Sequence, residues 1–281
     1  MNSPRPPVSL LFDNGSLRAE STRSLRRVAA SLATRLGREV RAASWLHSNR
    51  VPATELDGVP AALLGGALRE LLAESPSAAV DLHPLFFGPN AVLTEHLPAL
   101  LGELRASYPF ARFRLAPCLV DPGQPADCRI ARMLAAQVRS AAGAVGWKRP
   151  KALLVDHGSP VREVTAVRNH LGAQLRLELG DDVVAVGVAS MERRPGVEFA
   201  FNEPLLAAAL RTPPFDGGEV LLALQFLSPG RHAGPEGDIA TIARAAEADR
   251  PGLRTLMTEP LASHPGLVDV LADRLAVMRA V

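Results

Sequence analysis

The chain has 281 residues, of which 47% are hydrophobic and 21% charged, a composition typical of a soluble globular protein with one large domain or two ordinary ones. Its 31 basic and 29 acidic residues leave a formal net charge of +2, so the composition gives no indication of nucleic-acid binding. No apolar run approaches the roughly 18 residues that a membrane span needs. No signal peptide is recognisable in Met1–Pro7, and two cysteines are too few for a disulfide scaffold. We therefore expect a cytoplasmic protein that binds neither nucleic acid nor membranes.

Two similar apolar runs, one in each half of the chain, end in the same short motif. Residues 8–12 precede Asp13-Asn14-Gly15-Ser16, and residues 152–155 precede Asp156-His157-Gly158-Ser159. Farther along each half, the sequence Leu-Phe-Phe-Gly-Pro at residues 85–89 resembles Gln-Phe-Leu-Ser-Pro at residues 225–229. Such self-similarity predicts two copies of one structural unit. We expect the copies to cover residues 1–145 and 146–281, with a Gly- and Ala-rich linker at residues 140–150.

The second copy shows strand and helix patterns in alternation. Short apolar or β-branched runs predict strands at residues 152–155, 183–188, 220–224 and 253–257. Apolar residues at helical spacing predict helices over residues 164–175, 239–246 and 267–275. Strands that alternate with helices favour an α/β fold with a parallel sheet covered on both faces. In such sheets, ligands bind beyond the carboxyl ends of the strands, and two units side by side would face a shared cleft.

Three side chains that follow strands of the second copy are suited to a divalent metal ion. His157 comes directly after one strand, His232 follows another within Pro-Gly-Arg-His, and Glu192 follows the strand between them. Two imidazoles and a carboxylate suit a first-row metal, and a histidine can also accept protons near neutral pH. Structural roles are the alternative, because a histidine at a strand end is often only hydrogen-bonded, and Glu192 has arginines at 193 and 194 for a surface ion pair.

The two histidine motifs together resemble the sirohydrochlorin chelatase family, the small class II chelatases of siroheme and cobalamin synthesis. The resemblance runs through residues 154–159 and 226–232, then through Asp238-Ile239 and residues 259–265. It covers about residues 151–281 well and the first half only weakly. It implies two fused units, each a four-stranded parallel sheet flanked by helices. It also implies a lyase-class enzyme that inserts a divalent metal ion into a tetrapyrrole.

The resemblance also implies roles for individual residues. His157 and His232 would bind the incoming metal and take protons from the macrocycle, with Glu192 assisting. The metal, Co²⁺ or Fe²⁺ with Ni²⁺ as a third candidate, would be a substrate, and no permanently bound cofactor is expected. Sirohydrochlorin is rich in carboxylates, so we expect Arg231 and Arg162, together with Ser159, to contact it.

The first copy lacks these chemical groups. Asn14 is found at the position of His157, and residues 88–92 contain no counterpart of His232. The first half would therefore form a wall of the cleft and no second site, and the chain would be a monomer of two fused units or a weak homo-oligomer. A non-catalytic protein that carries metal or tetrapyrrole is the alternative function. Hydrolase chemistry is disfavoured, because neighbouring residues cannot form a Ser–His–acid triad and no GxSxG motif is present.

Overall fold

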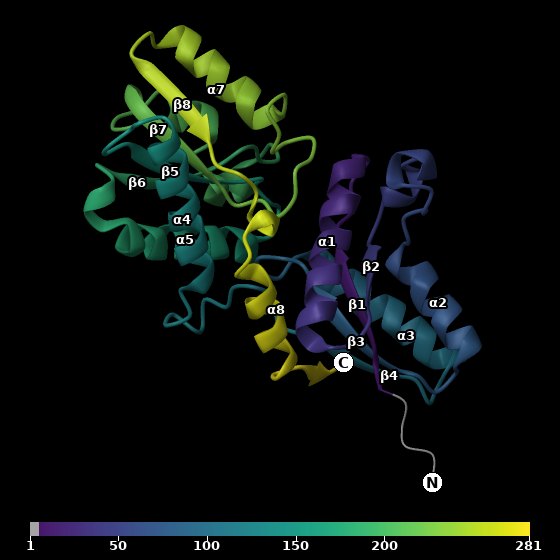
Figure 1. Ribbon diagram of the computed structural model, residues 1–281. Coiled ribbons are helices and arrows are strands. Elements are labelled where there is room, and N and C mark those ends of the chain that lie inside the picture. Colours follow the sequence, from purple (N-terminus) through teal and green to yellow (C-terminus); the bar gives the residue numbers. More distant parts are fainter. Residues whose placement is uncertain (1–5) are drawn as a thin grey trace. The chain divides into compact units, whose positions relative to one another are not determined.

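The structure, a computed structural model, describes residues 6–281 (Figure 1). Most of Met1–Pro7, where the sequence shows no signal peptide, lies outside the described residues. The chain divides into two compact units. Unit 1 consists of Met1–Leu119 and Pro265–Val281, and unit 2 of Val120–His264. In the part of the chain that is described, no helix combines the length and apolar composition that a membrane span requires.

Unit 1 is a sheet with helices on both faces. Its strands are β1 (Val8–Asp13), β2 (Val40–Ser44), β3 (Ala79–Pro84), β4 (Arg112–Leu115) and β9 (Arg279–Ala280). Its helices are α1 (Ala19–Leu36), α2 (Leu64–Glu74), α3 (Leu97–Ser107) and α8 (Leu267–Leu275). The sheet order is β2-β1-β3-β4-β9, and only β9 is antiparallel to its neighbour. The antiparallel β9 makes this a five-stranded sheet, where the sequence predicted four strands.

Unit 2 repeats the same plan. Its strands are β5 (Lys151–Asp156), β6 (Val186–Ser190), β7 (Gly218–Leu224) and β8 (Leu253–Met257). Its helices are α4 (Arg129–Ala144), α5 (Arg162–Leu179), α6 (Leu206–Ala209) and α7 (Asp238–Asp249). The four strands are parallel in the order β6-β5-β7-β8, which matches β2-β1-β3-β4 of unit 1 strand for strand. The expected fold class, two similar α/β units with parallel sheets, is therefore confirmed.

Short 3₁₀ or π turns complete the chain. They are Ser48–Arg50, Ala53–Leu56, Val92–His96, Gly180–Asp182, Val197–Asn202 and Leu261–Ser263. The strand expected at residues 183–188 begins at Val186, since the preceding Gly180–Asp182 turn delays it. The idea that the two units face a shared cleft concerns their relative placement and stays a prediction.

Both faces of each sheet bury apolar side chains, as the nearly continuous apolar strands require. In unit 2, Leu153, Val155, Val220 and Leu222 pack in one core with residues of α6 and α7. On the other face α4 and α5 lie side by side and contact the strands (Figure 1). The loops that carry the candidate site follow the carboxyl ends of β5, β6 and β7.

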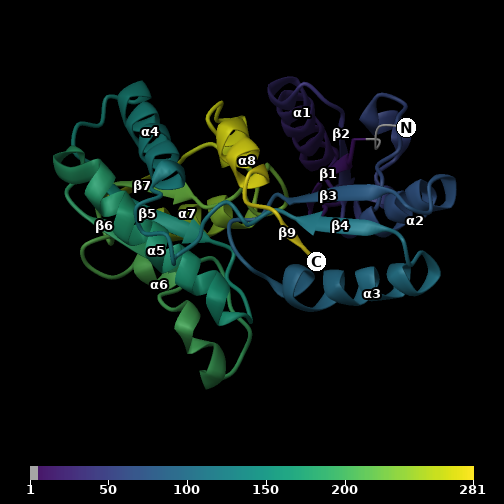
Figure 2. The ribbon, with the colours of Figure 1, turned by 90° about the horizontal axis from the view of Figure 1, so that it is seen from below.

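The helix that closes each repeat packs in the other unit. Helix α4 follows the fourth strand of unit 1 but belongs to unit 2, where it packs on α5. Helix α8 follows the fourth strand of unit 2 but belongs to unit 1, where it lies beside α1 (Figure 1, Figure 2). The boundary expected near residue 145 therefore differs from the structural division. Residues 140–144, expected in a linker, are the last residues of α4.

Candidate metal site

The first element of the site is the tight turn that follows β5. His157 is the first residue beyond the strand, and Gly158 has a φ of +90°. The backbone N–H of Glu192 donates to the carbonyl of His157 at 3.1 Å, so the loops after β5 and β6 lie against each other. A Cβ at Gly158 would come within 1.9 Å of the Glu192 carbonyl oxygen. Only glycine permits this close approach. The approach places the side chains of His157 and Glu192 at the same edge of the sheet.

His157 contacts each of the other two expected metal ligands. The rings of His157 and His232 meet edge to face, with centroids 4.6 Å apart and an interplanar angle of 67°. Nε2 of His157 lies 3.4 Å from Oε1 of Glu192. All three residues belong to unit 2, so the site does not depend on how the units are placed.

The hydrogen bonds of the two imidazoles determine where their lone pairs are. Nδ1 of His157 lies 3.0 Å from the Gly158 carbonyl oxygen, which can only accept a hydrogen bond. Nδ1 of His232 lies 2.6 Å from Oδ2 of Asp238. Both Nδ1 atoms must therefore carry the proton and donate it, and in the neutral ring each Nε2 keeps a lone pair. Nε2 is thus the atom of each ring that can bind a metal or accept a proton.

Asp238 is a candidate functional residue to which the sequence analysis gave no role. It is the first residue of α7 and holds His232 through the short hydrogen bond to Nδ1. A carboxylate behind a metal-binding histidine fixes the ring orientation and increases the basicity of the other nitrogen. The resemblance included Asp238-Ile239 without a role for either residue. The available signal was an acidic residue at the start of a helix six positions after a histidine.

A compact loop brings Asp238 back to His232. The N–H groups of Asp238 and Ile239 donate to the carbonyls of Arg231 and His232 at 3.4 and 3.3 Å. Gly237 lies inside this loop, where a Cβ would meet the His232 carbonyl oxygen at 2.5 Å. Glycine therefore lets α7 begin directly against the histidine.

The ligands are close to each other but do not form a closed cage. Within residues 6–281, no group of three or more His, Cys, Asp or Glu side chains is arranged to hold a metal ion. The side chains of His157 and Glu192 are 45% and 61% exposed, and that of His232 is 28% exposed. An open, exchangeable ligand set suits an ion that arrives and leaves, whereas a buried tetrahedral site would retain it.

Each of the expected substrate-binding residues has a different interaction partner. The Arg231 guanidinium is exposed and 3.6 Å from Asp238. The Arg162 guanidinium lies over the Phe201 ring at 4.6 Å from its centroid. The Ser159 hydroxyl accepts a hydrogen bond from the Val161 N–H and thus supports the turn into α5. The ion pair proposed as an alternative for Glu192 does not form with the adjacent arginine, because Arg193 pairs with Glu203 at 2.7 Å.

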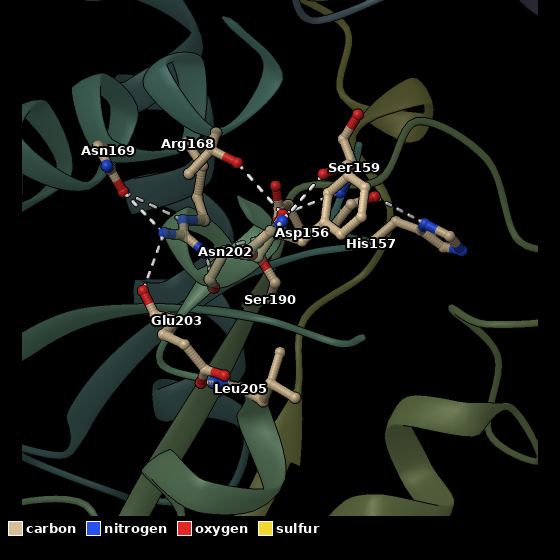
Figure 3. A network of polar contacts seen from close by, with 12 residues as sticks. Asp156, His157, Ser159, Arg168, Asn169, Ser190, Asn202, Glu203 and Leu205 are labelled. Carbon is tan, nitrogen blue, oxygen red and sulfur yellow. Dashed lines mark hydrogen bonds and ion pairs between the residues drawn. The ribbon is translucent and has the colours of Figure 1, made fainter. Parts of the chain in front are cut away.

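A buried polar network lies beneath the His157 turn (Figure 3). Asp156 accepts a hydrogen bond from Ser190 at 2.6 Å, and its carboxylate lies 3.8 Å from Arg168. Burial raises the pKa of Asp156, and the hydrogen bond from Ser190 and the charge of Arg168 oppose that rise. Burial also lowers the pKa of Arg168. This network anchors the strand end from which His157 projects.

Unit 1 keeps the backbone of this site without its ligands. The Leu46 N–H donates to the Asn14 carbonyl at 3.0 Å, as Glu192 does to His157. Gly15 has a φ of +82° and faces the Leu46 carbonyl, as Gly158 faces that of Glu192. Asn14 and Leu46 thus take the places of His157 and Glu192. Val92, at the distance from β3 that His232 has from β7, is buried and apolar.

Comparisons with known proteins concern the family and the fold. Residues 151–277 match the model of the CbiX family. SirB from Bacillus subtilis with Fe³⁺ is a structural neighbour, with a TM-score of 0.63 and 11% identity over 96% of this chain and 95% of that one. CbiX, described as the terminal enzyme of siroheme biosynthesis in denitrifying bacteria, has a TM-score of 0.59 and 20% identity over 96% and 98%. A further comparison with curated proteins found no match. The solved structures share the fold of the whole chain.

Proposed function

Since its C-terminal half belongs to the CbiX family and the whole chain has the fold of the sirohydrochlorin chelatases, we propose that the protein is a metal chelatase. Its substrates would be a divalent metal ion, Co²⁺ or Fe²⁺ with Ni²⁺ as a third candidate, and sirohydrochlorin or a related tetrapyrrole. A structural neighbour from Bacillus subtilis subspecies spizizenii holds cobalt, and the SirB structure above holds Fe³⁺. The reaction would contribute to siroheme or cobalamin synthesis.

The observation that carries the proposal is the contact between His157 and Glu192. The proton of His157 is on Nδ1, so the lone pair of Nε2 faces a carboxylate oxygen at 3.4 Å. Two acceptors repel each other at this distance unless a proton or a cation lies between them. A second lone pair, on Nε2 of His232, belongs to a ring whose centroid is 4.6 Å away. The arrangement therefore supports the proposal that these groups take up a proton or a metal ion.

Metal insertion requires both functions. The macrocycle loses two pyrrole N–H protons and gains one divalent ion, so charge balances when two protons leave the ring. His157 and His232 would offer Nε2 first to the metal ion and then, as the ion passes to the ring nitrogens, to the departing protons. Asp238 would hold the ring of His232 in place through its hydrogen bond to Nδ1. The exposed site lets these protons pass on to water.

Three further residues would contact the tetrapyrrole or support the site. Arg231 and Arg162 would pair with carboxylates of the tetrapyrrole, and Ser159 would hold the turn that presents His157. Arg162 would have to leave Phe201 or bind a carboxylate while stacked on it. The absence of a permanent cofactor, a cytoplasmic location and a monomer or weak homo-oligomer stay predictions from the sequence.

Insertion rates measured by absorbance test the proposal. Sirohydrochlorin is mixed with Co²⁺, Fe²⁺ or Ni²⁺, with and without the protein, and the change in the macrocycle spectrum is followed. A rate above the uncatalysed one with at least one metal is expected. A protein that binds Co²⁺ or sirohydrochlorin but leaves every insertion rate unchanged would instead be the non-catalytic carrier.

A further inference from the structure

Arg168 is the largest fully buried side chain of the chain's described part, with 1% of its surface exposed. A guanidinium buried in this way is costly unless its N–H groups are bonded. Nη1 donates to the Ser190 hydroxyl and, at 2.7 Å, to the Asn202 carbonyl. Nε and Nη2 donate to Oδ1 of Asn169 at 3.1 and 3.0 Å (Figure 3). Arg168 itself touches none of the expected metal ligands, so its role has to be found in its partners.

The first chain of contacts leads to the strand end before His157. Arg168 donates to Ser190, and Ser190 donates to Oδ1 of Asp156 at 2.6 Å. Ser190 is the last residue of β6, two positions before Glu192, and Asp156 immediately precedes His157. Backbone N–H groups at 191 and 192 complete the connection by donating to the carbonyls of Asp156 and His157. Arg168 therefore ties together the two segments that carry these ligands.

The second chain of contacts leads to the residue beyond the turn. The side chain of Asn202 makes two hydrogen bonds to the backbone of Ser159. Oδ1 accepts one from the Ser159 N–H, and Nδ2 donates one to the Ser159 carbonyl, each at 2.9 Å. Arg168 holds the carbonyl of Asn202. The turn at residues 157–159 is thus fixed before and after His157, and both connections pass through one guanidinium.

Unit 1 has the same fold but other residues at the positions of Arg168 and Asn202. Helices α1 and α5 both have 18 residues and both begin six positions after the aspartate of the repeated motif. The seventh helical residue is Arg168 in unit 2 and Leu25 in unit 1, where it is also buried. The bridges Ser44–Leu63 and Ser190–Leu205 align Pro60 with Asn202.

The aspartate and serine of the network, in contrast, are present in both units, as Asp13 and Ser44. The fold therefore accommodates a leucine at this place and keeps the aspartate. The arginine and the asparagine occur only in the unit that carries the metal ligands. A purely structural need would apply to both units equally.

We propose that Arg168 is a positioning residue of the metal site, which sets the placement of His157 against Glu192 and thereby the affinity for the divalent ion. The inference rests on the proposed function, because it assigns the metal to these ligands. The guanidinium acts through the Ser190–Asp156 pair on one side and through Asn202 on the other. The planar fork of arginine reaches both sides at once, which the single ammonium of a lysine cannot do.

The test compares two substitutions on the same helix. Arg168→Leu installs the residue of unit 1, and Gln174→Leu also removes a buried polar side chain of α5, one that donates to carbonyls at residues 125 and 127, away from the histidines. Calorimetric titration with Co²⁺ should show an affinity about 10- to 100-fold weaker for Arg168→Leu, the usual effect of losing an outer partner of a metal site. The visible spectrum of the bound Co²⁺ at saturation should change as well. Gln174→Leu should leave the affinity and the spectrum as in the wild type.

Further measurements keep the outcome decisive if Arg168→Leu does not fold. Arg168→Lys should give an affinity between those of wild type and Arg168→Leu, and Asn202→Ala should weaken Co²⁺ binding while Arg168 is still present. Wild-type affinity and spectrum in any folded Arg168→Leu protein, or in both Arg168→Lys and Asn202→Ala, would overturn the proposal.

A metal-free readout separates this proposal from the proposed function. In nitrogen NMR, the imidazole of His157, assigned with His157→Ala, should show a hydrogen-bonded Nδ1–H that is lost in Arg168→Leu and kept in Gln174→Leu. A wild-type protein that binds no metal would contradict the chelatase proposal, and the NMR signal would still decide whether Arg168 holds His157. An unchanged signal in Arg168→Leu would count against the positioning role.

Discussion

The two units of this chain have the same strand order and the same glycine turn, but only one carries chemically reactive side chains at that turn. Asp13-Asn14-Gly15-Ser16 and Asp156-His157-Gly158-Ser159 make equivalent backbone contacts with the loop after the next strand. The ligand positions differ at His157, Glu192 and His232, and so do the supporting positions at Arg168 and Asn202. The comparison teaches that one backbone accommodates two sets of side chains at this turn, and that the proposed ligands and their proposed supports differ together.

The largest expected effect comes from the histidines. His157→Ala or His232→Ala should reduce Co²⁺ affinity by more than 100-fold and abolish metal insertion, because each removes an Nε2 that no neighbouring group replaces. Thermal unfolding should change little, since His157 is exposed and His232 only partly buried. Titration of each variant with Co²⁺ measures the effect. Wild-type affinity in the double variant would place the metal elsewhere.

A smaller loss is expected from the residue behind His232. Asp238→Asn removes the charge at Nδ1 and should weaken Co²⁺ binding about 10- to 100-fold, as for other carboxylates that support a metal-binding histidine. Asp269→Asn is the matched control, because Asp269 is in the first turn of α8 in unit 1 and pairs with Arg35. Both substitutions cost a similar helix-dipole interaction, so only the metal affinity should distinguish them. Equal affinities for the two variants would remove Asp238 from the site.

In unit 1, the aspartate of the motif should affect stability and leave metal binding unchanged. Burial raises the pKa of Asp13 to about 6 from its ordinary value of 3.8. The folded state therefore binds the proton more tightly than the unfolded chain, and ionisation above pH 6 destabilises it. Asp13→Asn should raise the free energy of unfolding by roughly 1–3 kcal/mol at pH 8. The gain should shrink as the pH falls below 6 and vanish near pH 4.

Denaturant unfolding at a series of pH values checks this expectation. Asp57→Asn, at an exposed position of the same unit, supplies the baseline. The idea fails if Asp13→Asn is less stable than the wild type at pH 8, or if its effect does not depend on pH.

The smallest effect is expected at Asn14. Asn14→Ala should leave Co²⁺ affinity and insertion rate within twofold of the wild type, because unit 1 has Leu46 and Val92 where unit 2 has its other two ligands. The same assays as for His157→Ala provide the measurement. A loss as large as that of His157→Ala would contradict a site confined to unit 2.

Much of this organisation could be predicted from the sequence. The strand β8 has the expected bounds at residues 253–257, and the repeat predicted two units of one topology. The proximity of His157, Glu192 and His232 followed from their places after strands, because the carboxyl ends of parallel strands share one edge.

Other features depend on tertiary contacts that no local pattern specifies. Asp238 reaches His232 only because Gly237 lets the loop fold back on its own carbonyls. Arg168 looks like any polar residue of an amphipathic helix until its burial is known. The sequence also does not show that α4 packs in unit 2 and α8 in unit 1. The apolar stripe of a helix indicates that the helix packs against something, but not which unit it packs against.

That exchange has a consequence for how the protein is made. Residues 265–281 supply α8 and β9 of unit 1, and a ribosome synthesises them after every residue of unit 2. Unit 2 is complete once His264 has been added. Although domains usually fold in the order of synthesis, we expect unit 2 to fold first here, with its histidines in place while α1 still lacks the helix that covers it. A chain truncated after residue 264 should accordingly protect α5 from proteolysis and leave α1 open to cleavage.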